Sequence, residues 1–365
     1  MTDYGSLLTG TPGSTDEVGA LAGIAGLSRT EMRSAAQALG LPAYRGEQAW
    51  RWVHLRMAVE WSVMTDLGPA LQHEMARHFR VVTSQPVETV ASRDGTVRAV
   101  LQLTDGEVIE SVYIPAGERR TVCVSSQVGC RWACHFCASG KSGFRRSLQA
   151  AEMVDQVRWA ARHWGDRPTH VVFMGMGEPF DNYDAWIIAV RRLNDPEGLA
   201  IGARRITVST AGVIPGIERL AGEQLQIELS VSLHAPDSEL RSELMPINRR
   251  YPLPDLLKAC RRYTEKTRRI ITFEYTLIET VNDTRAHAQA LARLLAGFPC
   301  RVNLIPLSPV GEYEGRGPAR ESVRCFQEIL EKARINTTLR QSRGAEVEAA
   351  CGQLRLRRLQ QEGRS

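Results

Sequence analysis

Long hydrophobic runs, lysine and cysteine are all scarce in this chain of 365 residues. The longest apolar stretches, such as 171–174, fall far short of the ~20 residues that a bilayer-spanning helix needs. Residues 1–15 lack both the basic and the apolar stretch of a secretory leader. We therefore expect a cytoplasmic protein with no membrane partner. Eight cysteines are too few for a disulfide scaffold in a chain of this length, so any clustered thiols point to metal binding or catalysis.

Arginine takes the place of the missing lysine. Of 46 basic residues only four are lysine, and the formal net charge is +5. Paired guanidinium groups suit phosphate, because each planar fork donates two hydrogen bonds at once. Codon bias and solvated helix faces account for the same pattern equally well, so charge alone leaves RNA binding open. The arginine pairs stand at 119–120, 145–146, 204–205, 249–250 and 268–269.

The first third of the chain divides into three segments. Residues 1–22 are rich in Gly, Ser and Thr and are predicted to be a disordered leader. In residues 23–82 the apolar positions recur at helical spacing, which predicts a small helical accessory domain. Residues 83–118 alternate instead, and Asp94-Gly95 and Asp105-Gly106 supply tight turns, so this segment is predicted to be a β-hairpin extension.

Short apolar strands alternate with helical stretches through residues 119–350, and residues 351–365 form a basic tail. Repeated strand-then-helix units predict an α/β fold with a parallel sheet, curled into a partial (β/α) barrel with reactive groups at the carboxyl ends of its strands. The expected strands are 121–126, 169–174, 205–209, 226–232, 271–278, 301–306 and 337–340. The expected helices include 150–163, 252–266, 284–296 and 321–333.

A carboxylate interrupts the last strand of the hairpin extension. Glu110 shares one face with Val108, Val112 and Ile114, opposite a face that carries Ser111. Such a glutamate is ion-paired, at a sheet edge, or used in chemistry. All three interpretations remain open at this point.

Three cysteines follow the first strand of the barrel directly, as Cys130, Cys134 and Cys137 in a C-x3-C-x2-C pattern. Three thiolates can hold three irons of a four-iron, four-sulfur cluster and leave the fourth iron open to a ligand. This spacing, with an aromatic residue before the last cysteine, is typical of radical S-adenosylmethionine (SAM) enzymes. In these enzymes one electron cleaves the SAM sulfonium to a 5′-deoxyadenosyl radical. The alternatives are a structural zinc with His135 nearby and three unrelated buried thiols.

Polar motifs end three of the later strands. Residues 174–179 (Met-Gly-Met-Gly-Glu-Pro) offer glycines that let backbone approach a ligand, and a carboxylate, Glu178, that can meet an ammonium group. Residues 209–212 and 232–235 add hydroxyl, backbone and imidazole groups. Each motif alone is also typical of a plain turn or a structural histidine. Together, after a three-cysteine loop, they predict a cofactor site.

The linked motifs are similar to those of the RlmN/Cfr family of radical SAM RNA methyltransferases, over about residues 28–355. The resemblance implies methylation of an adenine in 23S ribosomal RNA, at C2 as in the RlmN branch, and of an adenine beside the anticodon of some tRNAs. The alternatives are C8 methylation as in the Cfr branch, a radical enzyme acting on a small molecule, and a non-catalytic RNA-binding protein with zinc. The motifs lie at 123–130, 130–137, 175–179, 232–235, 245–248, 281–283, 303–306 and 350–353.

The resemblance also assigns roles to single residues. Cys351 resembles the cysteine that takes a methyl group from one of the two SAM molecules used per turnover. Cys123 resembles the thiol that releases the product by forming a transient disulfide with Cys351, and Glu110 matches the proton acceptor. Cys130, Cys134 and Cys137 match the cluster ligands. The positions that match SAM contacts are Gly177, Glu178, Ser209, Ser232, Leu233 and His234.

The chain departs from the family pattern at Ser308, where an asparagine is expected among the SAM contacts. A serine hydroxyl donates and accepts hydrogen bonds but lacks the reach of an amide. The resemblance further implies a reductase or flavodoxin-type electron donor. We expect the protein to act as a monomer.

Overall fold

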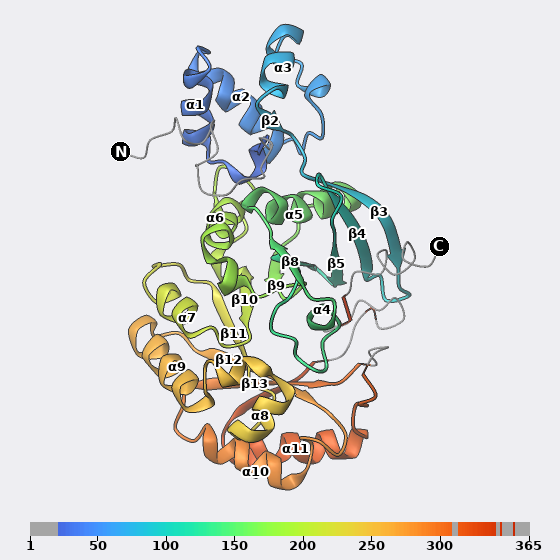
Figure 1. Ribbon diagram of the computed structural model, residues 1–365, viewed down its shortest axis with the longest axis vertical. Coiled ribbons are helices and arrows are strands. Elements are labelled where there is room, and N and C mark those ends of the chain that lie inside the picture. Colours follow the sequence, from blue (N-terminus) through green and yellow to red (C-terminus); the bar gives the residue numbers. More distant parts are fainter. Residues whose placement is uncertain (1–20, 309–312, 341–343, 345–352, 355–365) are drawn as a thin grey trace.

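The structure is a computed structural model that describes residues 21–308, 313–340, 344 and 353–354 (Figure 1). A group of N-terminal helices, drawn in blue, lies at one end of a larger α/β body. Nearly all of the predicted leader (1–22) and most of the predicted tail (351–365) lie outside the described residues. Within the described part, every helix is too short or too polar to cross a bilayer.

Local sequence signals explain the N-terminal helices. The Ser28 hydroxyl accepts a hydrogen bond from the backbone N–H of Glu31, whose carboxylate accepts one from the Ser28 N–H; this capping box starts the first helix. Gly40, at φ +73°, follows the end of that helix, and Pro69 begins the third. The elements are β1 (Ala22–Gly23), η2 (Ile24–Gly26), α1 (Arg29–Ala38), α2 (Ala43–His54), η3 (Trp61–Val63), α3 (Pro69–Ala76) and β2 (Phe79–Arg80).

One sheet of ten strands forms the main body. Its strands are β3 (Ser84–Ala91), β4 (Val97–Leu103), β5 (Val108–Ala116), β6 (Arg119–Cys123), β9 (His170–Phe173), β10 (Ile206–Thr210), β11 (Glu228–Ser232), β12 (Ile271–Leu277), β13 (Cys300–Pro306) and β14 (Asn336–Leu339). The strands lie in the order β14-β13-β12-β11-β10-β9-β6-β5-β4-β3. The first seven of this order run parallel, and β5, β4 and β3 extend the sheet antiparallel. Among the described strands β14 and β3 remain edges, so the predicted partial barrel with a hairpin extension is confirmed.

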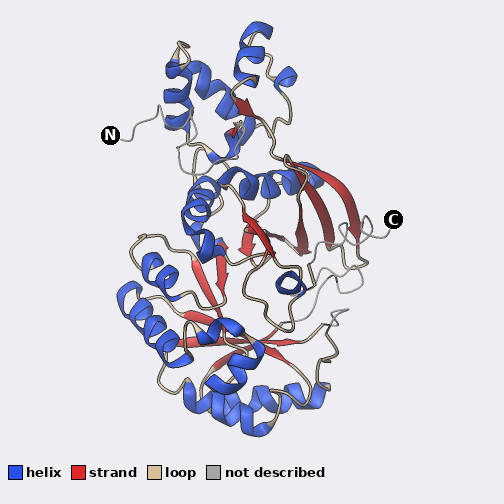
Figure 2. Cartoon of the chain, viewed as in Figure 1, coloured by secondary structure: helices blue, strands red, loops and turns tan. Residues whose placement is uncertain are grey.

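Helices cover the outer side of the parallel strands (Figure 2). They are α4 (Ala138–Lys141), α5 (Ala150–Trp164), η4 (Pro179–Asn182), α6 (Tyr183–Asn194), η5 (Ala203–Arg205), α7 (Ile214–Leu220), α8 (Ser238–Leu244), η6 (Pro246–Arg249), α9 (Leu253–Thr267), α10 (Arg285–Leu294) and α11 (Arg320–Lys332). Two more strands, β7 (Gln127–Gly129) and β8 (Phe144–Ser147), pair outside the main sheet.

Alternate residues of β12 point to opposite sides of the sheet, one side in the hydrophobic core and the other toward the interior of the barrel. Ile271, Phe273, Tyr275 and Leu277 are fully buried, and the Tyr275 ring packs against Phe326 of α11 at 5.3 Å. Burial of each such side chain contributes about 1.5–3 kcal/mol. The alternate residues, among them Glu274, face cavities inside the barrel. The period of two therefore places polar groups in the barrel interior.

The hairpin strand β5 is buried on both faces near its start, which differs from the simple alternation read from its sequence. Ile109 and Ser111 are as inaccessible as Val108 and Glu110. The Ser111 hydroxyl donates to the Cys123 carbonyl at 2.9 Å. β5 lies between β4 and β6 in the continuous sheet, so both of its edges are paired. In addition, β7 contacts β5 from outside this sheet.

A buried arginine of α5 joins the barrel to the N-terminal helices. The Arg158 side chain is fully buried and its guanidinium donates to the backbone carbonyls of Val53 (3.0 Å), Ala58 (2.6 Å) and Val81 (3.0 Å). Its charge is matched by an ion pair with buried Asp155. The Arg158 guanidinium thus connects the barrel helix α5 to the polypeptide that precedes the barrel.

Candidate active site

The cysteine loop is held between β7 and α4. Its first turn needs glycine: Gly129 has φ +73°, and a Cβ there would lie 1.8 Å from the Gly143 carbonyl oxygen. That carbonyl accepts a hydrogen bond from the Cys130 N–H at 2.9 Å. At the other end of the loop, the Cys137 N–H donates to the Cys134 carbonyl at 3.1 Å. The backbone therefore fixes where the three thiols emerge.

Cys130, Cys134 and Cys137 line one cavity of about 170 Å³. His135 is exposed and is not part of this lining. Zinc requires its ligands around one point, whereas each thiolate of an iron–sulfur cluster binds a different iron. Among the described residues, no three His, Cys, Asp or Glu side chains are grouped to hold a single metal ion. His135 is therefore not placed with the three thiols as a fourth ligand for zinc.

The electrostatics of the loop fit a positively charged metal group. Burial raises the pKa of the Cys130 thiol to about 12 and that of Cys134 well above its ordinary value, and the neighbouring thiols add to both effects. Thiolates there need compensating positive charge. Part of it comes from fully buried Arg241, whose charge lowers the pKa of Cys134. The Arg241 Nε is a buried donor with no hydrogen-bond partner among the described residues.

Arg241 also ties two strand ends together at the cavity. One of its terminal nitrogens donates to the carbonyls of Ala211, after β10, and Ser232, at the end of β11, at 2.7 and 3.0 Å. The other donates to Asn248 at 2.9 Å. The position of this side chain thus fixes the backbone on which Ser209 and Ser232 are carried.

The segment after β9 carries Gly177 and Glu178. Gly177 has φ +97°, and a Cβ there would lie 2.5 Å from the Gln127 Cβ, so no other residue fits. The Glu178 carboxylate accepts hydrogen bonds from the N–H groups of Ala211 (2.6 Å) and Phe180 (3.0 Å). Burial nevertheless raises the pKa of Glu178 to about 7. The Thr210 side chain is a third hydrogen-bond partner, which leaves about one acceptor position of this carboxylate open to the cavity that Glu178 lines.

His234 follows β11 in a left-handed conformation, φ +58°. Its Nδ1 accepts a hydrogen bond from the Thr276 N–H at 2.8 Å, and burial lowers its pKa to about 3. The ring is therefore neutral and carries its proton on Nε2, which is the donor left for a ligand. Ser209 and Ser232 line the same cavity. The Leu233 side chain is fully buried and does not line it, so only its backbone is placed for a contact.

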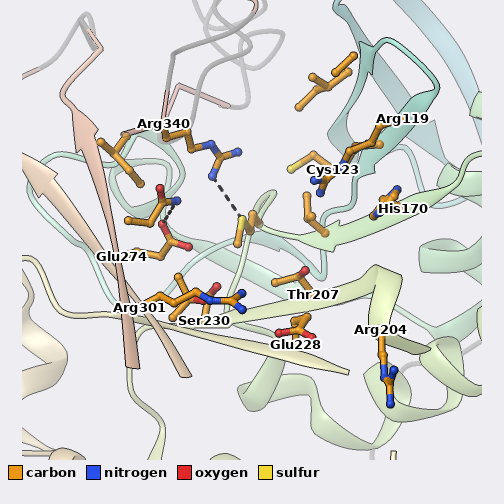
Figure 3. A pocket seen from close by; sticks show the side chains of 18 of the residues that line it. Arg119, Cys123, His170, Arg204, Thr207, Glu228, Ser230, Glu274, Arg301 and Arg340 are labelled. Carbon is orange, nitrogen blue, oxygen red and sulfur yellow. Dashed lines mark hydrogen bonds between the residues drawn. The ribbon is translucent and has the colours of Figure 1, made fainter. Parts of the chain in front are cut away.

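A second cavity, of about 600 Å³, occupies the interior of the barrel (Figure 3). Cys123, only 7% exposed, lines it together with Leu354. Figure 3 shows Cys123, Glu274 and Arg340 pointing into the same space. The two cavities adjoin, because five residues line both: Met174, Glu274, Ile305, Ser308 and Arg340.

Glu110 lies apart from this space. It lines neither cavity, and its buried carboxylate pairs with Arg98 at 2.6 Å. Arg98 in turn pairs with Glu88 at 2.6 Å. Of the three interpretations left open by the sequence, the structure therefore supports the ion pair. Cys351 lies outside the described residues.

Several residues of the two cavities escape the motifs. Glu274 and Arg340 line the barrel interior, and the charge of Arg241 acts on Cys134. A signal for Glu274 is present in the sequence, because it interrupts the apolar strand 271–278 as Glu110 interrupts 108–114. Arg241 has no comparable signal, because it belongs to a short amphipathic helix.

Family models match two parts of the chain. Residues 124–292 match the model described as Radical SAM superfamily. Residues 22–81 match the model described as Ribosomal RNA large subunit methyltransferase N-terminal domain. The two matches together cover the cysteine loop, most of the barrel and the N-terminal helices.

Named relatives match almost the whole chain. A protein of Gloeobacter violaceus, named probable dual-specificity RNA methyltransferase RlmN, is 47% identical over 340 residues, which cover 93% of this chain and 97% of that protein. A protein of the same name from Thermoanaerobacter sp. is 45% identical over 325 residues, covering 88% and 94%. Among solved structures, a radical SAM methyltransferase from Sphaerobacter thermophilus is 46% identical, with a TM-score of 0.89 over 92% of this chain and 99% of that one.

Proposed function

Since the chain belongs to the RlmN family of radical SAM RNA methyltransferases, we propose that it methylates C2 of a specific adenine in 23S ribosomal RNA. Its second substrates are tRNAs with an adenine beside the anticodon. The observation that carries the proposal is the pair of adjoining cavities: one contains the three-cysteine loop, and the other contains the further thiol Cys123 in a space of nucleotide size. Transfer between a bound cofactor and a bound base requires such adjoining spaces.

The cofactors of the family are a four-iron, four-sulfur cluster and SAM, which when bound supply a radical able to functionalise a carbon that polar methyl transfer cannot reach. Cys130, Cys134 and Cys137 would hold the cluster. Gly177 lets the backbone approach SAM. The polar contacts to SAM come from Glu178, Ser209, Ser232 and His234, the backbone at Leu233, and Ser308, which lines both cavities.

The remaining roles fall to two cysteines and a glutamate. Cys351 first carries the methyl group as a thioether, and the carbon of this group is then joined to the base. The Cys123 thiolate then attacks the sulfur of Cys351. As the disulfide forms, the bond between this sulfur and the methylene carbon breaks, its electron pair stays with the carbon, and the carbon takes up a proton to become the methyl group of the released RNA. A disulfide requires Cα atoms within about 7 Å. Leu354, three residues after Cys351, lines the same cavity as Cys123, and three residues of chain span at most ~11 Å.

Glu110 takes up the proton lost from the base carbon in this scheme. Its backbone carbonyl accepts a hydrogen bond at 2.6 Å from the hydroxyl of Ser125, which follows two residues after Cys123 of the larger cavity. Its carboxylate forms an ion pair with buried Arg98 at 2.6 Å. A pathway of one intervening group or water would link it to the cavity.

The function is tested by mapping the methylated carbon. Total RNA from a strain lacking the gene should lose 2-methyladenosine at one 23S position, and the purified, anaerobically reconstituted protein should restore it. 8-methyladenosine in its place would move the protein to the Cfr-type reaction. SAM cleavage without any methylated RNA would indicate a small-molecule substrate, and tightly bound zinc with no iron would refute radical chemistry.

We predict that SAM affinity depends on the ionisation of Glu178. Because burial raises the pKa of Glu178 to about 7, the carboxylate that accepts a hydrogen bond from the SAM amino group is lost as pH falls below 7. The Kd should rise by up to about tenfold per pH unit there. Anaerobic calorimetry on the holoprotein between pH 6 and 8.5 measures this. The Glu178→Gln variant should bind SAM weakly, and its Kd should not rise as the pH falls below 7. Identical curves of Kd against pH for the two proteins would contradict the role of Glu178 in SAM binding.

A further inference from the structure

A row of polar side chains crosses the barrel interior on neighbouring strands. Glu274 of β12, Asn303 of β13 and Thr338 of β14 are direct register partners. The Asn303 amide nitrogen donates to the Glu274 carboxylate at 2.8 Å, and the Asn303 carbonyl oxygen accepts from the Thr338 hydroxyl at 3.0 Å. Thr338 therefore fixes the orientation of the amide, and the amide fixes the carboxylate. The row is rigid and holds one carboxylate in place.

Glu274 has acceptor positions that the protein does not fill. It is 5% exposed and lines both cavities. A carboxylate offers about four acceptor positions, and Asn303 and Ser230 take two of them. Burial raises the pKa of Glu274, an effect that the charge of Arg340 opposes. A ligand that brings an N–H donor to this point would satisfy the group.

The same cavity is lined by arginines that lack acidic partners. In the described part of the chain, no carboxylate forms an ion pair with Arg119, Arg204 or Arg301. By contrast, Arg120 pairs with Asp166 at 3.1 Å. A cavity with unmatched cations and one buried acceptor fits a nucleotide, because phosphates bind guanidinium groups and a base amino group donates to a carboxylate.

We propose that Glu274 selects the target base by accepting a hydrogen bond from the 6-amino group of adenine. This inference rests on the proposed function. It identifies the residue that distinguishes adenine from other bases at the target position. A purine with oxygen at position 6 places an acceptor against the carboxylate and leaves both groups unpaired. A charged hydrogen bond of this kind is worth about 10- to 100-fold in affinity.

The wild-type holoenzyme gives the first test. Three versions of the RNA that it methylates carry adenosine, purine riboside or inosine at the target position, and Kd and kcat/KM are measured for each under anaerobic conditions. Purine riboside, which lacks the amino group, should bind about 10- to 100-fold more weakly, and inosine more weakly still. Equal values for adenosine and purine riboside would overturn the role of Glu274 and leave the proposed function intact. Absence of methylation on every RNA would refute the proposed function itself.

A matched pair of variants gives the second test. Glu274→Gln should lower the preference for adenosine over inosine by at least about tenfold, because an amide can also donate to O6, while iron content and SAM affinity stay unchanged. Glu228→Gln is the control: Glu228 lines the same cavity, but its carboxylate is ion-paired with Arg269. We expect its base preference to match wild type. An unchanged preference in Glu274→Gln, or an equal change in both variants, would contradict the proposal.

Discussion

Replacing Cys134 with alanine should give a colourless protein that neither cleaves SAM nor methylates RNA. Cys134 lies between two other buried thiols in one cavity. Two remaining thiolates cannot hold a cluster with a single open iron. Iron analysis, visible absorption and 5′-deoxyadenosine formation after anaerobic reconstitution measure the loss. Serine at this position should fail as well, because a hydroxyl is not ionised at neutral pH.

A cysteine elsewhere in the barrel provides the control for that loss. Cys325 lies on α11, outside both cavities, and its sulfur accepts a hydrogen bond from Arg285. Cys325→Ala should keep its colour and activity. Full iron content and SAM cleavage in Cys134→Ala would show that the loop does not carry the cluster, and the proposed reaction would lose its basis.

Replacing Cys123 with alanine should trap the protein on its RNA. If Cys123 is the thiol that frees Cys351, its removal leaves the base joined to Cys351 through carbon and sulfur. Cys123 is nearly inaccessible and lines the cavity that Leu354 also lines. Single-turnover reactions with labelled RNA should show a band on denaturing gels that survives heating and disappears with nuclease. Multiple turnover should be lost.

Two variants separate this role from a loss of packing. Cys300→Ala, on β13 and outside both cavities, should turn over normally without an adduct. The double variant Cys123→Ala, Cys351→Ala should form no adduct, because the attachment point is gone. A Cys123→Ala protein that turns over normally would exclude the resolving role.

The fold follows from the sequence because its signals are local. The period of two in the hairpins, the Asp-Gly turns and the strand-then-helix alternation predict the element order, with ends shifted by up to three residues. The strand expected over 121–126, for example, ends at Cys123, and the strand expected from 205 begins at Ile206 after a 3₁₀ turn over Ala203–Arg205. The burial of both faces of β5 could not be predicted from the sequence, because it depends on which other elements pack against the sheet, as β7 does.

Part of the candidate site could likewise be predicted from the sequence, and part could not. The cysteine loop and the segment around Gly177 are runs of adjacent residues, so their spacing identifies them. The row of Glu274, Asn303 and Thr338 joins residues about thirty positions apart, and only the register of three strands brings it together. Glu110 is an intermediate case: its partner Arg98 lies diagonally across the hairpin, since the residue directly opposite is Val100.

The guanidinium of Arg158 limits how this protein can be dissected. The side chain comes from the barrel, but its acceptors at Val53, Ala58 and Val81 come from the polypeptide that precedes the barrel. Removing residues 1–81 would take away all three carbonyl acceptors and leave Asp155 as the ion-pair partner of Arg158, a loss of about 1–3 kcal/mol for each hydrogen bond that water does not replace. We therefore expect the barrel alone to be less stable than the full chain, and work on a minimal enzyme has to keep both parts.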